Sequence, residues 1–80
     1  MGKYILYTTD NCNICNRAKS LIQRQELNIE VRKAAMEEIK DFRAKKIFSF
    51  PVLTDETGEI ISFGLQAGYY IAENIAKFKN

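Results

Sequence analysis

The fold of this chain is decided by residues 4–15, which read YILYTTDNCNIC. Apart from Lys3, residues 3–8 are apolar, aromatic or β-branched, which is typical of a short buried strand. Residues 9–11 are of turn and helix-cap type, and beyond them apolar side chains recur at helical spacing, as Ile14, Ala18, Leu21 and Ile22. The spacing predicts a helix running to about residue 25. Both cysteines of the chain therefore lie where a strand passes into the first turn of a helix.

The remaining pattern predicts three more strands and two more helices. Residues 28–33 alternate as a strand, and residues 35–46 carry apolar side chains at helical spacing. Residues 51–54 and 59–63 are strands joined by a hairpin turn, and Ile71, Ala72, Ile75 and Phe78 line one face of a last helix. The order is βαβαββα. We therefore expect an α/β chain with a four-stranded mixed sheet flanked by three helices, because a strand–helix–strand unit gives parallel neighbours and a tight hairpin gives antiparallel ones.

Length and composition indicate one small globular domain covering residues 1–80. Hydrophobic residues make up 46% of the chain, and its net charge of +2 is too mild to predict nucleic-acid binding. The first residues do not resemble a signal peptide, and no segment has the length and apolarity of a membrane span. We expect a cytoplasmic monomer, in the host cytoplasm if the chain is phage-encoded. A disulfide in a reducing compartment is usually catalytic or transient.

The position of the cysteines predicts different roles for the two sulfurs. A helix N-terminus offers unpaired backbone N–H groups and the positive end of the helix dipole, and both favour a thiolate over a thiol. We expect a lowered pKa for Cys12, which would make it the nucleophile. Cys15 lies about one turn deeper and would resolve the mixed disulfide formed at Cys12. Asp10, just before the helix, is the favoured capping residue.

Three other interpretations of the cysteine pair remain open. A structural disulfide across so short a loop would stabilise the fold by only roughly 2 kcal/mol in the chain-entropy model. A zinc site needs four ligands, and the chain has no histidine and no third cysteine. Two inert core cysteines are the third interpretation. The strand-to-helix position favours the redox pair over all three.

At this point the chain resembles the glutaredoxin family of the thioredoxin fold. The likeness lies in residues 5–8 and 12–19, in Phe50-Pro51-Val52 and in residues 58–64. It implies that Pro51 is a cis proline facing the cysteines. The backbone of Phe50 would then pair with an extended, peptide-like substrate such as glutathione or the tail of a reductase.

Three departures from the family pattern shift the expected partners. Asn13-Ile14 replaces the usual proline–aromatic pair, Thr9 stands where lysine is common, and Phe63-Gly64-Leu65-Gln66 replaces a double glycine and an acidic pair. They weaken the case for tight glutathione binding and favour redoxins that serve ribonucleotide reductase and are reduced by thioredoxin reductase. The N-terminus of the last helix can still receive a carboxylate. The candidate substrate-binding residues are Thr9, Asn13, Ile14, Phe50, Pro51, Gly64, Leu65 and Gln66.

The expected function is therefore that of a dithiol–disulfide oxidoreductase acting on protein or glutathione mixed disulfides through Cys12 and Cys15. No bound metal or organic cofactor is expected, because the sulfurs carry the electrons. Glutathione or thioredoxin reductase would supply those electrons. The alternative is a thioredoxin-fold binding module whose cysteines hold a metal or iron–sulfur centre in a dimer.

Overall fold

The computed structural model describes residues 3–79 of the chain. Strands and helices alternate in the predicted order as far as the last helix. The elements are β1 (Tyr4–Thr8), α1 (Asn13–Gln25), β2 (Ile29–Lys33), α2 (Met36–Ala44), β3 (Val52–Thr54), β4 (Ile60–Phe63), α3 (Leu65–Glu73) and α4 (Ile75–Phe78). None of these helices is both long and apolar enough to cross a lipid bilayer.

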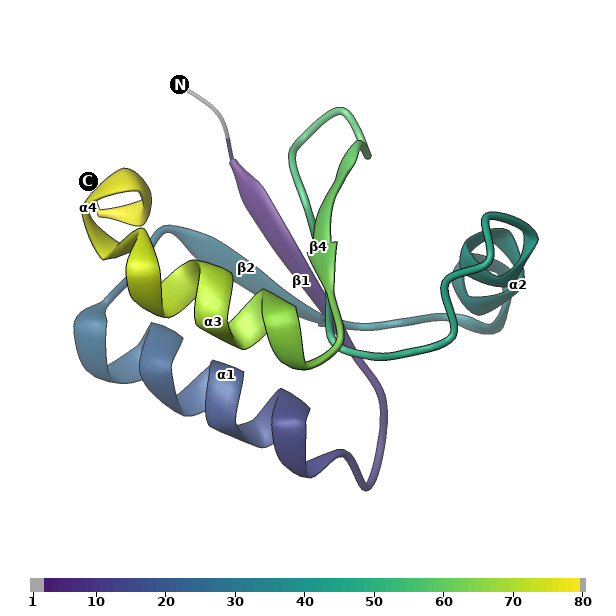
Figure 1. The fold of residues 1–80 in the computed structure, drawn as a ribbon, viewed down its shortest axis with the longest axis horizontal. Coiled ribbons are helices and arrows are strands. Elements are labelled where there is room, and N and C mark those ends of the chain that lie inside the picture. The colour runs from purple at the N-terminus through teal and green to yellow at the C-terminus, as the bar shows by residue number, and fades with distance from the viewer. Residues whose placement is uncertain (1–2, 80) are drawn as a thin grey trace.

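The four strands form one mixed sheet in the order β2-β1-β3-β4, which confirms the predicted sheet. β1 runs parallel to β2, with Leu6 beside Val31. β1 is antiparallel to β3, where Leu6 faces Leu53, and β3 is antiparallel to β4. Strand β1 is thus central, and it carries the cysteine-bearing loop out of the middle of the sheet (Figure 1).

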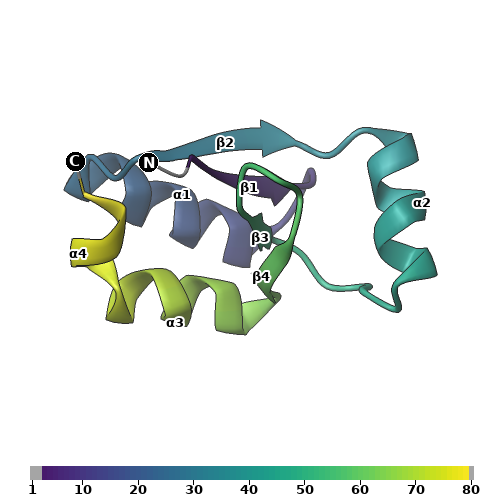
Figure 2. The same ribbon diagram turned by 90° about the horizontal axis from the view of Figure 1, so that it is seen from above.

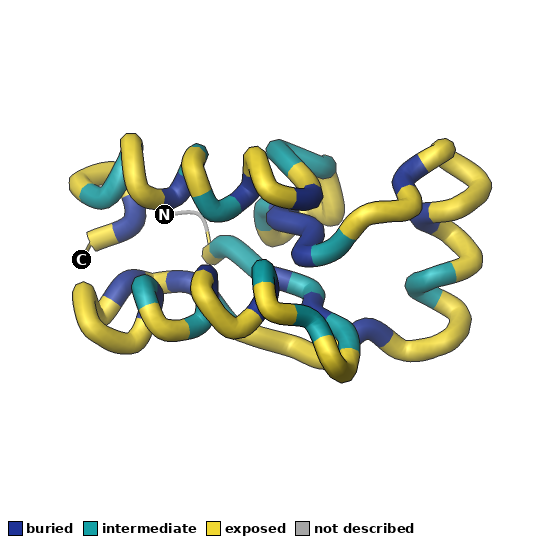
Figure 3. Tube along the Cα trace, turned by 60° about the horizontal axis from the view of Figure 1, so that its bottom comes forward, coloured by how far each residue is buried: buried dark blue, intermediate teal, exposed yellow. Residues whose placement is uncertain are grey.

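Helices α1 and α3 cover one face of the sheet and lie side by side (Figures 1 and 2). Apolar residues at i, i+3 and i+4 spacing give each helix one buried stripe, as Figure 3 shows by the dark blue segments along each helix. The main core lies between this helix pair and the sheet. It consists of Leu6, Ala18, Ile22, Leu27, Ile29, Leu53, Ala67, Ile71 and Phe78.

Helix α2 lies apart from the other helices, beyond the end of β2 (Figure 2), and is largely exposed (Figure 3). Its buried residue Phe42 packs with Ile47 and Val52 in a second, smaller cluster. Tyr7 joins this cluster and alternates along β1 with Leu6, so the second cluster lies on the opposite face of the sheet. This face is only partly covered.

The predicted number of three helices is wrong, because the last helical segment breaks at Asn74. The Nδ2 of Asn74 donates to the carbonyl oxygen of Tyr70 at 2.8 Å. That oxygen is the acceptor that the backbone N–H of Asn74 would use in a continuous α-helix. The backbone N–H instead reaches the carbonyl of Ile71, and Asn74 leaves helical geometry with φ −127° and ψ 35°. The result is two helices, α3 and α4.

Candidate redox site

Cys12 and Cys15 are joined by a disulfide, with their Cα atoms 5.2 Å apart. Cys12 is half-buried, whereas Cys15 is only 1% exposed because it faces inward from the first turn of α1. The two sulfurs therefore differ in access. A substrate approaching from solvent meets the sulfur of Cys12 first.

Cys12 is itself the N-cap of helix α1. Its backbone is extended (φ −118°, ψ 102°), its sulfur accepts a hydrogen bond from the backbone N–H of Cys15 at 3.1 Å, and its carbonyl accepts from Asn16 at 3.0 Å. The first of these bonds places one of the unpaired N–H groups of the helix terminus on the reactive sulfur. No acidic residue lies in the first turn to oppose a negative charge there.

The expectation that Asp10 caps this helix is wrong. Its exposed carboxylate forms an ion pair with the ammonium of Lys33 at 2.9 Å. Asn11, with φ 56°, turns the chain between Asp10 and the helix. The cap position therefore falls to Cys12, two residues later than expected. A sulfur takes the place that a serine or aspartate oxygen usually fills.

A thiolate is a better hydrogen-bond acceptor than a thiol, because bonds to a charged group are about twice as strong. The N–H of Cys15 and the helix dipole therefore stabilise the sulfur of Cys12 most when it is released as a thiolate. Reduction of the disulfide leaves that sulfur at the same helix terminus. The arrangement favours Cys12 as nucleophile and as leaving group in thiol–disulfide exchange.

The segment before β3 borders the disulfide. The peptide bond between Phe50 and Pro51 is cis, as the resemblance implied. The carbonyl oxygen of Phe50 lies 3.8 Å from the sulfur of Cys12, and Pro51 is buried. The ring of Phe50 packs edge-to-face on Phe42, with centroids 5.9 Å apart. Helix α2 thus holds in place the backbone that faces the sulfur of Cys12.

Gly64 connects the same segment to helix α3. Its N–H donates to the carbonyl of Pro51 at 2.8 Å. Its φ is +67°, and a Cβ at this position would lie 3.1 Å from the Cβ of Ser49. Both features favour glycine here. Gly64 therefore fixes the start of α3 close to the cis-proline segment.

The other predicted site residues fall into two groups. Ile14 and the half-exposed Leu65 line one pocket, so the structure brings them together. Thr9 is half-buried in the loop after β1, and Asn13 and Gln66 are exposed in the first turns of α1 and α3. Among the described residues, the side chains of these three form no hydrogen bond with either cysteine.

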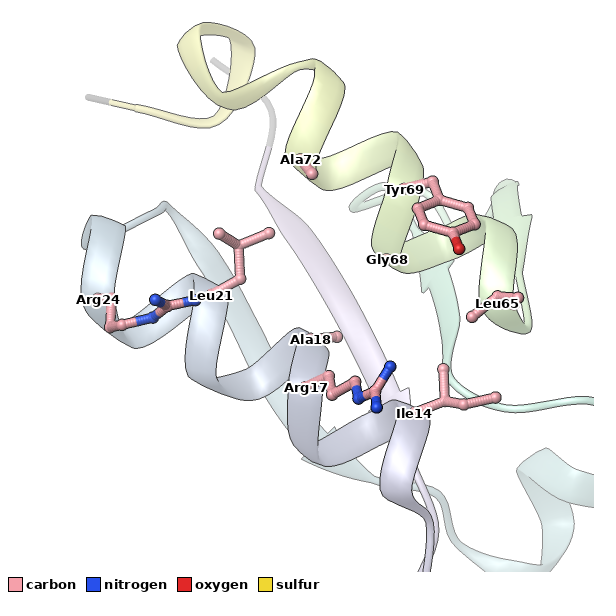
Figure 4. Close-up of a pocket in the computed structure, with 9 residues that line it drawn as sticks. All are labelled: Ile14, Arg17, Ala18, Leu21, Arg24, Leu65, Gly68, Tyr69 and Ala72. Carbon is pink, nitrogen blue, oxygen red and sulfur yellow. The ribbon is translucent and has the colours of Figure 1, made fainter.

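A groove that the sequence did not predict runs between α1 and α3 (Figure 4). Its volume is about 300 Å³, and one end is formed by Ile14 and Leu65 beside the redox pair. The lining residues recur at helical spacing on both helices, but this spacing alone does not show that the two helices border one groove. They are Ile14, Arg17, Ala18, Leu21 and Arg24 of α1, and Leu65, Gly68, Tyr69 and Ala72 of α3.

Tyr7, near the end of β1, belongs to the face of the sheet opposite α1 and α3. Its ring packs on Phe42 with centroids 5.4 Å apart, and the guanidinium of Arg32 lies over it at 5.9 Å. Burial raises the pKa of the Tyr7 hydroxyl, and the nearby carboxylate of Glu38 raises it further. These contacts assign Tyr7 to packing.

Among residues 3–79, no three side chains of the histidine, cysteine, aspartate or glutamate type come close enough together to hold a metal ion. No protein-family model matches the chain, and no curated protein matches it significantly.

Proposed function

We propose that this protein is a glutaredoxin-like dithiol–disulfide oxidoreductase. One observation carries the proposal: the sulfur of the half-buried Cys12 caps helix α1 and accepts the N–H of Cys15, a residue that is itself only 1% exposed. A structural disulfide needs neither a helix N-terminus nor one accessible sulfur. A reactive pair benefits from both.

The surroundings of the pair support a thioredoxin-like fold for the chain. The observed sheet, in which β1 and β2 are parallel and β3 and β4 antiparallel, is the mixed sheet that the order of elements predicts. The cis peptide bond before Pro51 lies beside Cys12, in the place where the resemblance puts it. The break of the last helical segment at Asn74 does not alter the sheet or the cis peptide bond before Pro51.

The proposed reaction moves two electrons and two protons from the dithiol to a substrate disulfide. The Cys12 thiolate attacks one substrate sulfur, and a bond forms between them as the substrate S–S bond breaks. The departing substrate thiolate takes up a proton. Cys15 then loses its proton and attacks the sulfur of Cys12, which forms the Cys12–Cys15 disulfide and releases the second substrate thiol.

The carbonyl of Phe50, 3.8 Å from the sulfur of Cys12, suggests how a substrate lies. An extended, peptide-like segment fits along the backbone of Phe50, and a carboxylate of that segment fits the N–H groups at the start of α3. Glutathione meets both requirements, and so does the tail of a reductase. We propose a disulfide-bearing protein such as ribonucleotide reductase as substrate, glutathione or thioredoxin reductase as electron source, and the cytoplasm as the compartment.

Two coupled assays test the function and identify the reductant. The first follows NADPH oxidation during reduction of 2-hydroxyethyl disulfide with glutathione and glutathione reductase. The second follows insulin reduction with thioredoxin reductase and NADPH. Wild type, Cys12→Ser and Cys15→Ser are compared, with Ser20→Ala, an exposed substitution in α1, as the matched control.

We expect Cys12→Ser to lose activity in both assays, and Ser20→Ala to behave as wild type. Cys15→Ser keeps activity only in the glutathione assay, because glutathione can replace Cys15 in releasing the substrate from Cys12. Full activity of Cys12→Ser, or an inactive wild type in both assays, contradicts the proposal.

A further inference from the structure

The groove between α1 and α3 starts at the redox pair and leads away from it. Ile14, which separates the two cysteines together with Asn13, lies at one end opposite Leu65, and Arg24 and Ala72 lie at the other (Figure 4). From Ile14 to Arg24 the groove follows roughly 15 Å of helix axis, given a rise of 1.5 Å per residue. That length matches four or five residues of extended chain.

The floor of the groove is apolar and made partly of small residues. Ala18, Gly68 and Ala72 leave room between the larger side chains of the two helices, and a Cβ added at Gly68 would meet no atom within 4 Å. Leu65 and Tyr69 are 50% and 59% exposed along the edge. The groove can therefore receive apolar side chains of a partner without rearrangement of the backbone.

The charge of the groove is of one sign. Arg17 and Arg24 lie on it, and none of the nine residues that line it is acidic. Within residues 3–79 neither arginine takes part in an ion pair, whereas Lys3, Arg32 and Lys33 each pair with a carboxylate. The two guanidinium groups are seven residues apart on one helix, so their Cα atoms are roughly 10 Å apart along the axis. They are available to carboxylates of a partner.

We propose that this groove binds an acidic segment, interspersed with apolar side chains, of the protein whose disulfide is reduced at Cys12. The inference rests on the proposed function, because it places the docking segment next to the attacking sulfur. Arg17 and Arg24 recognise the carboxylates. Leu65 and Tyr69 contact the apolar side chains, and docking brings the partner's disulfide to the end of the groove at Ile14.

Two synthetic peptides test the proposal. Each holds one disulfide loop next to a five-residue segment, with Glu and Leu alternating in one peptide and Lys and Leu in the other. Binding of cysteine-free versions to the oxidised protein is measured by fluorescence anisotropy, which needs no redox chemistry. The variants are Arg17→Glu with Arg24→Glu, and a matched control, Lys40→Glu with Arg43→Glu on α2. Each pair of substitutions lowers the net charge by four, from +2 to −2.

We expect the wild type and the α2 control to prefer the acidic peptide. In the groove variant, affinity for it falls at least about fivefold, since two attractions become repulsions at exposed sites. Turnover of 2-hydroxyethyl disulfide stays at the wild-type level. Raising the salt from 0.05 to 0.5 M removes most of the preference, because exposed charges are screened.

The two proposals fail in distinguishable ways. Equal binding of the two peptides by wild type, or an equal loss in the groove variant and the α2 control, overturns the docking groove even if 2-hydroxyethyl disulfide is reduced. Selective binding of the acidic peptide by a protein that reduces no disulfide overturns the proposed function and leaves the groove standing.

Discussion

The N–H of Cys15 gives a direct test of how Cys12 is activated. Cys15 is the third residue of α1, where a backbone N–H has no partner within the helix, and here it donates to the sulfur of Cys12 at 3.1 Å. Proline is tolerated in the first helical turn for that reason. Cys15→Pro therefore deletes this one donor, whereas Cys15→Ala retains it. Both variants remove the second thiol and leave Cys12 free to titrate.

The expected effect follows from the strength of a hydrogen bond to a charged group. Such bonds contribute about 1.5–3 kcal/mol, and we take the lower value because Cys12 is half-exposed. Since 1.36 kcal/mol corresponds to one pH unit, the midpoint of thiolate formation in Cys15→Pro should lie about one unit above that in Cys15→Ala. The more basic thiolate is intrinsically about threefold more nucleophilic, at a Brønsted slope near 0.45. The net rate well below both midpoints therefore falls by about threefold.

The measurement is the rate of iodoacetamide alkylation of each variant from pH 5 to 9. Thiolate absorbance at 240 nm gives the midpoint independently. Circular dichroism shows whether both variants keep the helix content of the wild type. Equal midpoints in two folded variants refute the idea that the amide of Cys15 stabilises the thiolate.

Three further predictions concern the fold around the site. Phe78 is 1% exposed and packs on the core, so Phe78→Ala should lower the free energy of unfolding by about 3–5 kcal/mol in urea titrations. Phe48 is 70% exposed, so Phe48→Ala should change that free energy by less than about 0.5 kcal/mol. Similar losses in the two variants would contradict this assignment of the core. The hydroxyl of Thr54 is buried without a hydrogen-bond partner among the described residues, so Thr54→Val should stabilise the protein by about 1 kcal/mol, and a lower melting temperature argues against this. Asp55 accepts hydrogen bonds from Thr57, which lower the pKa of its carboxyl below the ordinary 3.8. Near neutral pH, Asp55→Asn should therefore be less stable than wild type, and this difference in the free energy of unfolding should close as the pH falls below 3.8. A difference that persists in acid would contradict a stabilising role of the ionised carboxyl.

The sequence was most informative where one local pattern governs the structure. Residues 4–15 predicted the strand, the turn and the helix that carry the cysteines, because strand and helix periodicity change at one point. The mixed sheet followed from the order of elements, since the chain between the first two strands needs a crossover and the hairpin does not. The disulfide pair could be predicted for the same reason.

The parts that sequence analysis missed depend on competition between nearby groups. Asp10 has the chemistry of an N-cap, but its ion pair with Lys33 and the left-handed turn at Asn11 leave that position to Cys12. The sequence pattern around Asn74 is compatible with a continuous helix. In the structure, however, the side chain of Asn74 donates to the carbonyl oxygen of Tyr70. The spacing of apolar residues predicts neither the cap of α1 nor the break at Asn74. Each depends on which of several nearby hydrogen-bonding or charged groups a side chain contacts.

The groove was missed for a different reason. Its residues have the spacing of a helix, but a helical stripe alone does not show whether another helix covers it. Ala18 and Leu21 were predicted only to share one face of the helix that follows the cysteines. Only the placement of α3 beside α1 shows that these residues border one hollow.

Trapping of the mixed disulfide tests the central claim that Cys12 attacks and Cys15 resolves. Reduced Cys15→Ser and reduced Cys12→Ser are each mixed with a peptide disulfide at pH 7, and the products are followed by intact mass spectrometry and peptide mapping. We predict a stable adduct on Cys12 in Cys15→Ser and almost none in Cys12→Ser, because the remaining sulfur of Cys15 is 1% exposed. An equally fast adduct on Cys15 in the Cys12→Ser variant would contradict the assignment.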